Sequence, residues 1–159
     1  MVRKFPVLLA MKSLVVEASI ENLNGVIDFI NSELERHNCP PNIQSDINLA
    51  AEEIFTNIAN YAYQPASGSA AISIAVGKEE AVVRFEDTGK IYNPLEHPKP
   101  AMEKPLMERD VGGLGVFLVK KIMDKVDYER IENRNVLVLT KRFGKINASA
   151  LLGEERKMC

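Results

Sequence analysis

Two side chains of one predicted helix could do chemistry together. In the segment Ala51-Glu-Glu-Ile-Phe-Thr-Asn57, Glu53 and Asn57 are four residues apart and share a helix face. A carboxylate can accept a proton or orient a hydroxyl, and an amide oxygen can join the oxygen shell of Mg²⁺. Glu52 is an alternative base, but the spacing to Asn57 favours Glu53. A solvated polar stripe gives the same pattern, and for this segment alone it is the favoured interpretation.

The end of a predicted strand carries a second candidate motif, Glu86-Asp-Thr-Gly89. Asp87 can accept a hydrogen bond from an exocyclic amine, and an unpaired buried acceptor discriminates against ligands that lack the donor. Gly89 allows a ligand or the backbone to approach closely. An ordinary Asp-Thr-Gly turn looks the same, so this motif alone is weak evidence for a site.

Glycines before a third predicted helix form the last candidate, Gly112-Gly-Leu-Gly115. Backbone N–H groups at the start of a helix attract anions such as phosphate. No Gly-Lys-Ser/Thr follows, so this is not a P-loop, and a long loop precedes it, which argues against a dinucleotide fingerprint. The three motifs together are stronger evidence than any one of them.

The elements that must position these motifs follow from apolar periodicity and from glycine and proline punctuation. Strands are predicted at 13–18, 71–76, 81–86, 126–132 and 136–142, and helices at 20–36, 41–64 and 116–123. Ser19 or Asn22 would cap the first helix, and a turn at Asn133-Arg-Asn135 would join the last two strands. The pattern predicts an α+β fold, a two-layer sandwich whose mixed, mainly antiparallel sheet is covered on one face by helices.

Length and composition indicate one domain. The chain has 159 residues, of which 46% are hydrophobic and 26% charged, as in soluble globular proteins. We expect the domain to span 12–143, with an N-terminal extension at 1–11 and a C-terminal tail at 144–159. The loop Tyr92–Asp110 is long enough to be functional.

Charge and cysteine usage exclude several classes of function. The formal net charge of −2 makes nucleic acid and anionic membranes poor candidates as partners. The apolar run at 5–11 contains Pro6, ends at Lys12 and is followed by no clean cleavage site, which argues against a signal peptide, and it is too short for a membrane span. Cys39 and Cys159 form no close pair, which favours a cytoplasmic location, and His37 and His97 are too far apart to predict a His/Cys metal site.

Taken in order, the three motifs resemble the ATP-binding domain shared by gyrase-type ATPases, MutL and histidine kinases. The most specific resemblance is to the small anti-sigma factor serine kinases of bacterial partner-switching systems. It covers about 12–143 and is carried by Glu53-Ile-Phe-Thr-Asn57 with Tyr61-Ala-Tyr63, by Asp87-Thr-Gly-Lys-Ile-Tyr-Asn-Pro-Leu95, and by Gly113-Leu-Gly-Val-Phe-Leu-Val-Lys-Lys-Ile-Met-Asp124. After Gly89, Lys90-Ile-Tyr92 replaces the further glycine of gyrase-type sites, which favours the small kinase branch.

The resemblance implies a Bergerat-type ATP-binding fold with ATP and Mg²⁺ as cofactors. By position, Asp87 beside Gly89 would bind the adenine amino group, and Asn57 would bind Mg²⁺. Glu53 would orient or deprotonate the attacking serine, and phosphoryl transfer needs mainly positioning and charge neutralisation. The phosphates would be bound by the backbone of Gly112, Gly113, Leu114 and Gly115 and, at the γ-phosphate, by Arg109.

The same resemblance implies the partners. The acceptor would be a serine of an anti-anti-sigma, STAS-type protein, and another state of the chain would hold a sigma factor, with ATP shifting the balance. A homodimer is expected by analogy, with Leu14, Val16 and the first helix in its interface or in the core. A non-catalytic, ATP-gated regulator of the same fold is the main alternative. A MutL-like clamp fragment and a structural domain without a ligand are less favoured.

Overall fold

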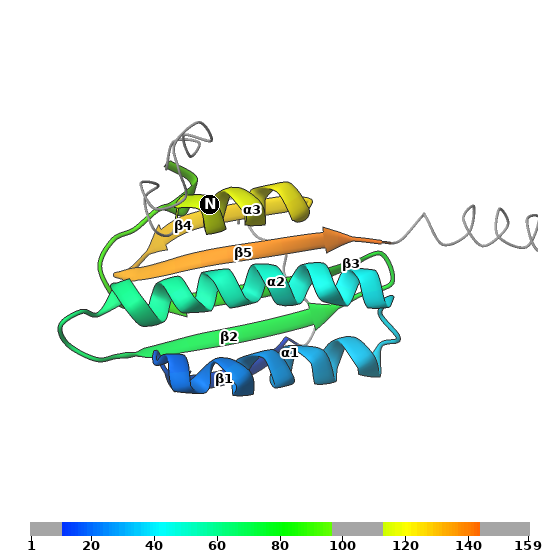
Figure 1. Cartoon of the computed structure of the whole chain (residues 1–159), viewed down its shortest axis with the longest axis horizontal. Helices are drawn as coiled ribbons and strands as arrows, with labels where there is room; N and C mark the ends of the chain where they lie inside the picture. Colours follow the sequence, from blue (N-terminus) through cyan, green and yellow to red (C-terminus); the bar gives the residue numbers. More distant parts are fainter. Residues whose placement is uncertain (1–10, 97–112, 144–159) are drawn as a thin grey trace, which may run out of the picture.

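A computed structural model describes residues 11–96 and 113–143 and has the predicted order of elements (Figure 1). The strands are β1 Lys12–Glu17, β2 Ser69–Val76, β3 Glu80–Asp87, β4 Lys125–Ile131 and β5 Arg134–Arg142, and the helices are α1 Leu23–Arg36, α2 Pro41–Asn57 and α3 Gly113–Ile122. Short 3₁₀ turns lie at Ile20–Asn22 and Pro94–Glu96. The predicted extension, the tail and most of the loop Tyr92–Asp110 fall outside these residues. No helix in the described ranges is both long and apolar enough to cross a membrane.

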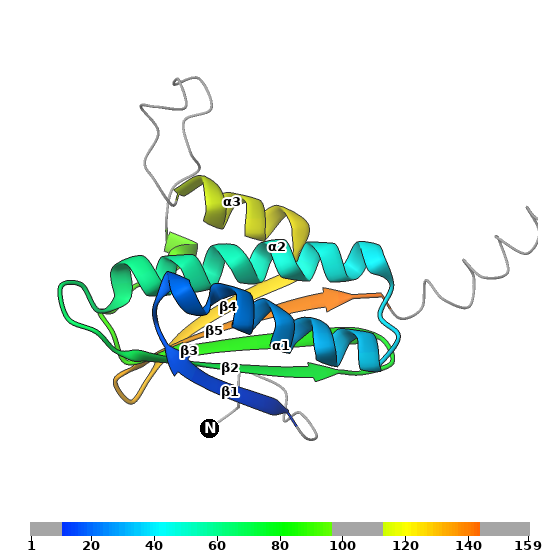
Figure 2. The ribbon, with the colours of Figure 1, turned by 60° about the horizontal axis from the view of Figure 1, so that its bottom comes forward.

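The five strands form one sheet in the order β1-β2-β3-β5-β4. The helices lie together on one face of it, as Figures 1 and 2 show, which confirms the two-layer α+β prediction. Every adjacent pair among the described strands is antiparallel, so the prediction of a mixed sheet was wrong in that detail. The chain returns through α3 so that β4 runs in the direction of β3, but β5 lies between these two strands.

The core lies between the helices and the sheet. Helix α2 runs over the middle of the sheet and contacts both α1 and α3. Its Phe55 and the β3 residue Phe85 are almost fully buried, together with Ile47 and Ile72. Burying a side chain of this size stabilises the fold by about 1.5–3 kcal/mol. This packing fixes the orientation of α2 about its own axis, and hence the direction in which its polar face points.

The second helix ends differently from the prediction. An α-helix to Gln64 was expected, but the α-helix stops at Asn57 and one wider π-helical turn, η2 (Ile58–Ala62), follows. The carbonyl oxygen of Ala62 accepts a hydrogen bond from Lys90 N at 2.9 Å, and the Tyr63 hydroxyl accepts one from Thr88 N at 2.8 Å. These contacts to the loop after β3 replace a further α-helical turn, and they could not be predicted from helical periodicity.

The last hairpin also corrects a prediction. A turn at Asn133-Arg-Asn135 was expected, but the turn consists of Glu132 and Asn133, with φ values of 44° and 69°. Two left-handed residues give the turn whose twist matches that of paired strands. Asn135 therefore lies inside β5, directly opposite Asp87 of β3.

Only one of the two predicted capping residues caps. The Ser19 side chain accepts a hydrogen bond from Glu21 N at 3.4 Å at the start of the first 3₁₀ turn. Asn22 makes no capping bond with its side chain, which instead donates to the carbonyl oxygen of Glu17 at 2.9 Å. Ser19 therefore caps the 3₁₀ turn and not α1, which begins only at Leu23.

Candidate functional site

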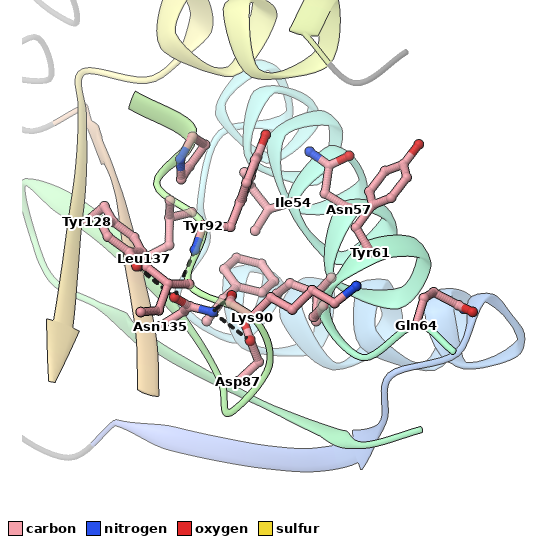
Figure 3. A pocket seen from close by; sticks show the side chains of 15 residues that line it. Ile54, Asn57, Tyr61, Gln64, Asp87, Lys90, Tyr92, Tyr128, Asn135 and Leu137 are labelled. Atoms are coloured by element: carbon pink, nitrogen blue, oxygen red, sulfur yellow. Dashed lines mark hydrogen bonds between the residues drawn. The ribbon is translucent and has the colours of Figure 1, made fainter. Parts of the chain in front are cut away.

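A cavity of about 340 Å³ opens between α2, η2, the loop after β3 and the strands β4 and β5 (Figure 3). Apolar and aromatic side chains form most of its wall, among them Ile54, Ile58, Phe85, Tyr92 and Leu137. Its few polar groups include those of Asn57, Asp87, Lys90 and Asn135. A largely apolar cavity of this size with a few converging polar groups is typical of a site for a small molecule.

Asp87, the last residue of β3, lines this cavity and is only 7% exposed. Its Oδ1 atom accepts hydrogen bonds from Gly89 N and from Asn135 Nδ2, both at 2.9 Å. Within the described part of the chain no group donates to Oδ2. Asp87 therefore offers the cavity a carboxylate oxygen that can accept a hydrogen bond from a ligand.

Gly89 is where the loop after β3 meets η2. A Cβ atom on this residue would overlap the carbonyl oxygen of Ala62 and would lie 2.7 Å from its carbonyl carbon. The sequence predicts that Gly89 allows the close approach of a ligand or of the backbone, and in the structure the backbone of Ala62 approaches it. The loop that carries Asp87 is thereby packed against the end of α2.

Glu53 and the glycine segment come together, although about sixty residues separate them in the sequence. A Cβ atom on Gly115 would overlap Oε2 of Glu53 and would lie 3.0 Å from its Cδ. Glu53 is half-buried, whereas the neighbouring Glu52 is exposed. The start of α3 thus lies against the carboxylate predicted to be the base, and the exposure of Glu52 agrees with the choice of Glu53.

Asn57 lies one turn beyond Glu53 on α2 and lines the cavity (Figure 3). Its Nδ2 atom is buried, and no described residue forms a hydrogen bond with it. A buried amide without a partner is costly, so this side chain fits a group that the described residues do not supply. The unpaired Nδ2 group is a donor and fits a hydrogen-bond acceptor, whereas Mg²⁺ binds oxygen atoms. Magnesium binding through Oδ1 of Asn57 therefore stays a prediction.

The remaining predicted site residues are described in part or not at all. Gly113 and Leu114 form the first residues of α3, and only their backbone is described. Arg109 and Gly112 lie outside the described residues. Among the described residues, no three His, Cys, Asp or Glu side chains cluster in a way that could hold a metal by themselves.

The sequence prediction missed Asn135, a buried residue of β5 that joins Asp87 to the rest of the cavity wall. Its Nδ2 atom donates to Asp87 Oδ1 and to the carbonyl oxygen of Lys90, at 2.9 and 2.7 Å. Its Oδ1 atom accepts from the Tyr128 hydroxyl at 2.6 Å and from Tyr92 N at 3.4 Å. A two-residue turn in the last hairpin was the signal that could have placed Asn135 beside Asp87.

Tyr128 is the hydroxyl donor of this network. Burial raises the pKa of the Tyr128 hydroxyl. The charge of Arg130 and a hydrogen bond with the Tyr92 backbone lower this pKa, whereas the charges of Asp87 and Glu96 raise it. The net pKa lies above the ordinary value. The hydroxyl therefore keeps its proton at neutral pH and can donate to Asn135.

Comparison with known proteins gives a family and two relatives. Residues 16–141 match the family model described as the histidine kinase-like ATPase domain. Serine/threonine-protein kinase BtrW from Bordetella bronchiseptica is 27% identical over 95 residues, which cover 59% of this chain and 67% of the relative. Serine-protein kinase RsbW from Halalkalibacterium halodurans is 28% identical over 101 residues, which cover 60% of each chain. The chain thus spans about two thirds or less of the length of these relatives.

Proposed function

We propose that this chain, which belongs to the histidine kinase-like ATPase domain family, is an ATP-dependent serine protein kinase and anti-sigma factor of a bacterial partner-switching system. By name, one of the relatives above is a serine/threonine-protein kinase and the other a serine-protein kinase. The observation that carries the proposal is the contact between the Glu53 carboxylate and the start of α3 at Gly115. A protein that only binds nucleotide needs no base at that place, whereas a kinase does.

In this proposal, ATP binds with its adenine in the cavity and its amino group on Asp87. The open Oδ2 atom of Asp87 and the apolar wall of the cavity support this placement. The phosphates extend towards the N-terminus of α3, where the backbone N–H groups of Gly112, Gly113, Leu114 and Gly115 bind them. A helix N-terminus preceded by glycines suits anionic phosphates.

Asn57 is the proposed protein ligand of Mg²⁺, and Arg109 the proposed contact to the γ-phosphate. The Oδ1 atom of Asn57 would be the ligand, and support for it comes from the place of Asn57 in the cavity wall, one helical turn beyond Glu53. When bound, Mg²⁺ neutralises phosphate charge. The role of Arg109 rests on its position three residues before the glycine segment, since the structure does not describe it.

Glu53 is the proposed catalytic base. The Oγ atom of the acceptor serine forms a bond to the γ-phosphorus, the bond from that phosphorus to the bridging oxygen of ADP breaks, and the serine proton passes to the Glu53 carboxylate. Because a carboxylate is ionised at neutral pH, Glu53 can accept this proton directly. Its contact with Gly115 supports its place beside the phosphates.

The proposed acceptor is a serine of an anti-anti-sigma, STAS-type protein, and the proposed alternative partner is a sigma factor. ATP would favour one of the two complexes by binding it more tightly. These partners place the chain in the cytoplasm, and a homodimer is the proposed assembly.

A phosphotransfer assay tests the proposal. The purified chain is incubated with Mg²⁺, γ-labelled ATP and each purified STAS-type protein encoded in the same genome. We expect one of them to gain phosphoserine, located by mass spectrometry. Glu53→Gln should lower the rate about 100-fold or more, in the range of general base catalysis, and retain ATP binding.

The matched control for this assay is Glu52→Gln, which changes the exposed neighbour and should retain full activity. ATP binding without transfer to any acceptor would contradict the kinase assignment. It would leave the ATP-gated, non-catalytic regulator as the function of this fold.

A further inference from the structure

The hydrogen bonds of Asn135 use its whole capacity. The two N–H groups of its amide donate to Asp87 Oδ1 and to the carbonyl oxygen of Lys90, and its oxygen accepts from the Tyr128 hydroxyl and from Tyr92 N. An amide has two donors and two acceptor positions, so none remains for a ligand. Although Asn135 lines the cavity, it can act on a ligand only through its neighbours.

The network also permits one orientation of the amide only. If the amide were rotated by half a turn, its oxygen would face the oxygens of Asp87 and Lys90, and its nitrogen would face the N–H group of Tyr92. Those contacts would be repulsive. The oxygens of Asp87 and Lys90 and the N–H group of Tyr92 therefore require the same orientation, in which Asn135 presents N–H groups to Asp87.

The carboxylate of Asp87 is held at one oxygen by two donors from different elements. Gly89 N belongs to the loop after β3, and Asn135 Nδ2 belongs to β5. Two donors on Oδ1 fix the plane of the carboxylate and leave Oδ2 as its only acceptor for a ligand. The same amide ties the loop at Lys90 to β5, so the carboxylate and the wall of the cavity are positioned together.

We infer that Asn135 is a positioning residue for recognition of the purine amino group. It holds Asp87 so that one carboxylate oxygen faces the donor on the base, and it fastens the loop Lys90–Tyr92 that closes the cavity beside it. This inference rests on the proposed function, because it takes the base to be adenine. It assigns the selection of an amino-bearing purine to a pair of residues, Asp87 and Asn135, that only the fold brings together.

The test compares two nucleotides that differ in one group. Titration calorimetry with Mg²⁺ measures the dissociation constants of ATP and of purine riboside 5′-triphosphate, which lacks the 6-amino group. The unmodified chain should prefer ATP roughly 10-fold or more, as expected for a hydrogen bond to a charged group. In Asn135→Asp at pH 8, ATP affinity should fall roughly 10-fold more than the affinity for purine riboside triphosphate, so that the preference disappears.

Two further variants make this result specific. Tyr128→Phe removes one of the four hydrogen bonds that hold the Asn135 amide and should reduce the preference a few-fold. If thermal melting shows that Asn135→Asp does not fold, the nucleotide preference of Tyr128→Phe tests the inference instead. The control is Asn48→Asp, a polar substitution at the α1–α2 contact, where Asn48 donates to Asn31 at 2.8 Å away from the cavity. It should keep the full preference.

A second readout is the pH dependence of the preference in Asn135→Asp. The new carboxyl faces Asp87 Oδ1, and two carboxylates this close tend to share a proton. In the described part of the chain, the other charged and titratable groups near this cavity wall include Lys90 and Tyr92 of the loop, Tyr128 and Arg130 of β4, Tyr61 and Glu96. Lowering the pH from about 8 to about 6 should restore part of the preference in the variant, because the shared proton again bridges to Oδ1. The unmodified chain should show no such recovery.

The outcomes separate the two ideas. If the unmodified chain binds neither nucleotide, the proposed function fails. If it prefers ATP but Asn135→Asp keeps that preference, or weakens both nucleotides by the same factor, Asn135 is merely structural and this inference alone is overturned.

Discussion

At the scale of single residues, the approach of Gly115 to Glu53 is the contact with the most direct consequence. The overlapping atom would be the end of a flexible side chain, so a methyl group at Gly115 can be accommodated by moving the Glu53 carboxylate. Displacing a proposed base by about 1 Å is enough to cost about 100-fold in rate. Because Gly115 has no side chain, the Glu53 carboxylate can keep the position proposed for the base.

Gly115→Ala should lower phosphotransfer at least 10-fold, since a smaller displacement has a smaller effect, and should leave the melting temperature nearly unchanged. Gly25→Ala is the matched control, because nothing lies within 4 Å of a Cβ atom at this exposed position of α1. It should keep full activity and stabilise the fold by about 0.5–1 kcal/mol, measured by urea unfolding. Equal activity of the two variants would contradict the proposed place of Glu53.

At the scale of elements, Glu33 joins the first helix to the edge of the sheet. Its carboxylate, on α1, pairs with Lys12 of β1 at 3.1 Å and with His37 at 3.0 Å. Burial alone would raise the pKa of Glu33, but the hydrogen bonds of Lys12 and His37, with the charges of Lys12 and Arg36, hold that pKa below its ordinary value. The ionised form is therefore favoured in the folded state.

A carboxyl whose pKa is lowered by folding stabilises the fold above its unfolded pKa, and this stabilisation is lost as the pH falls through the folded pKa. The unmodified chain should thus be more stable than Glu33→Gln near pH 7, and the difference should shrink as the pH falls below about 4.3. Urea unfolding of both at several pH values measures it, with Glu35→Gln, at an exposed position of the same helix, as the control. A difference that stays constant with pH would contradict this account of Glu33.

The elements also show what the sequence could and could not predict. Strands and helices with a clear apolar period were predicted within a few residues, because periodicity reflects which face is buried. The end of α2 and the last turn were not. The π-helical turn at Ile58–Ala62 depends on hydrogen bonds to residues near Thr88 and Lys90, which are distant in sequence. The turn at Glu132 and Asn133 contains no glycine to reveal its left-handed backbone.

At the scale of the whole molecule, one sheet with helices on one face brings distant segments into a single site. The α2 residues Glu53 and Asn57, the β3 residue Asp87 and the start of α3 lie around or beside one cavity. The sequence named these residues because their types and order resemble a known nucleotide site. Asn135 could not be predicted in this way, because only the strand register, which the sequence pattern did not reveal, places it opposite Asp87.

The most direct test of the account is the affinity for ATP with Mg²⁺ of the unmodified chain and of Asp87→Asn. This substitution keeps the shape of the side chain and an oxygen for Asn135 and Gly89, but it removes the charge and turns a donor towards the adenine amino group. We expect the unmodified chain to bind ATP and the variant to bind it roughly 100-fold more weakly, as expected for a lost charged hydrogen bond. Equal affinities, or no binding by the unmodified chain at millimolar ATP, would contradict the assignment of this cavity as an ATP site.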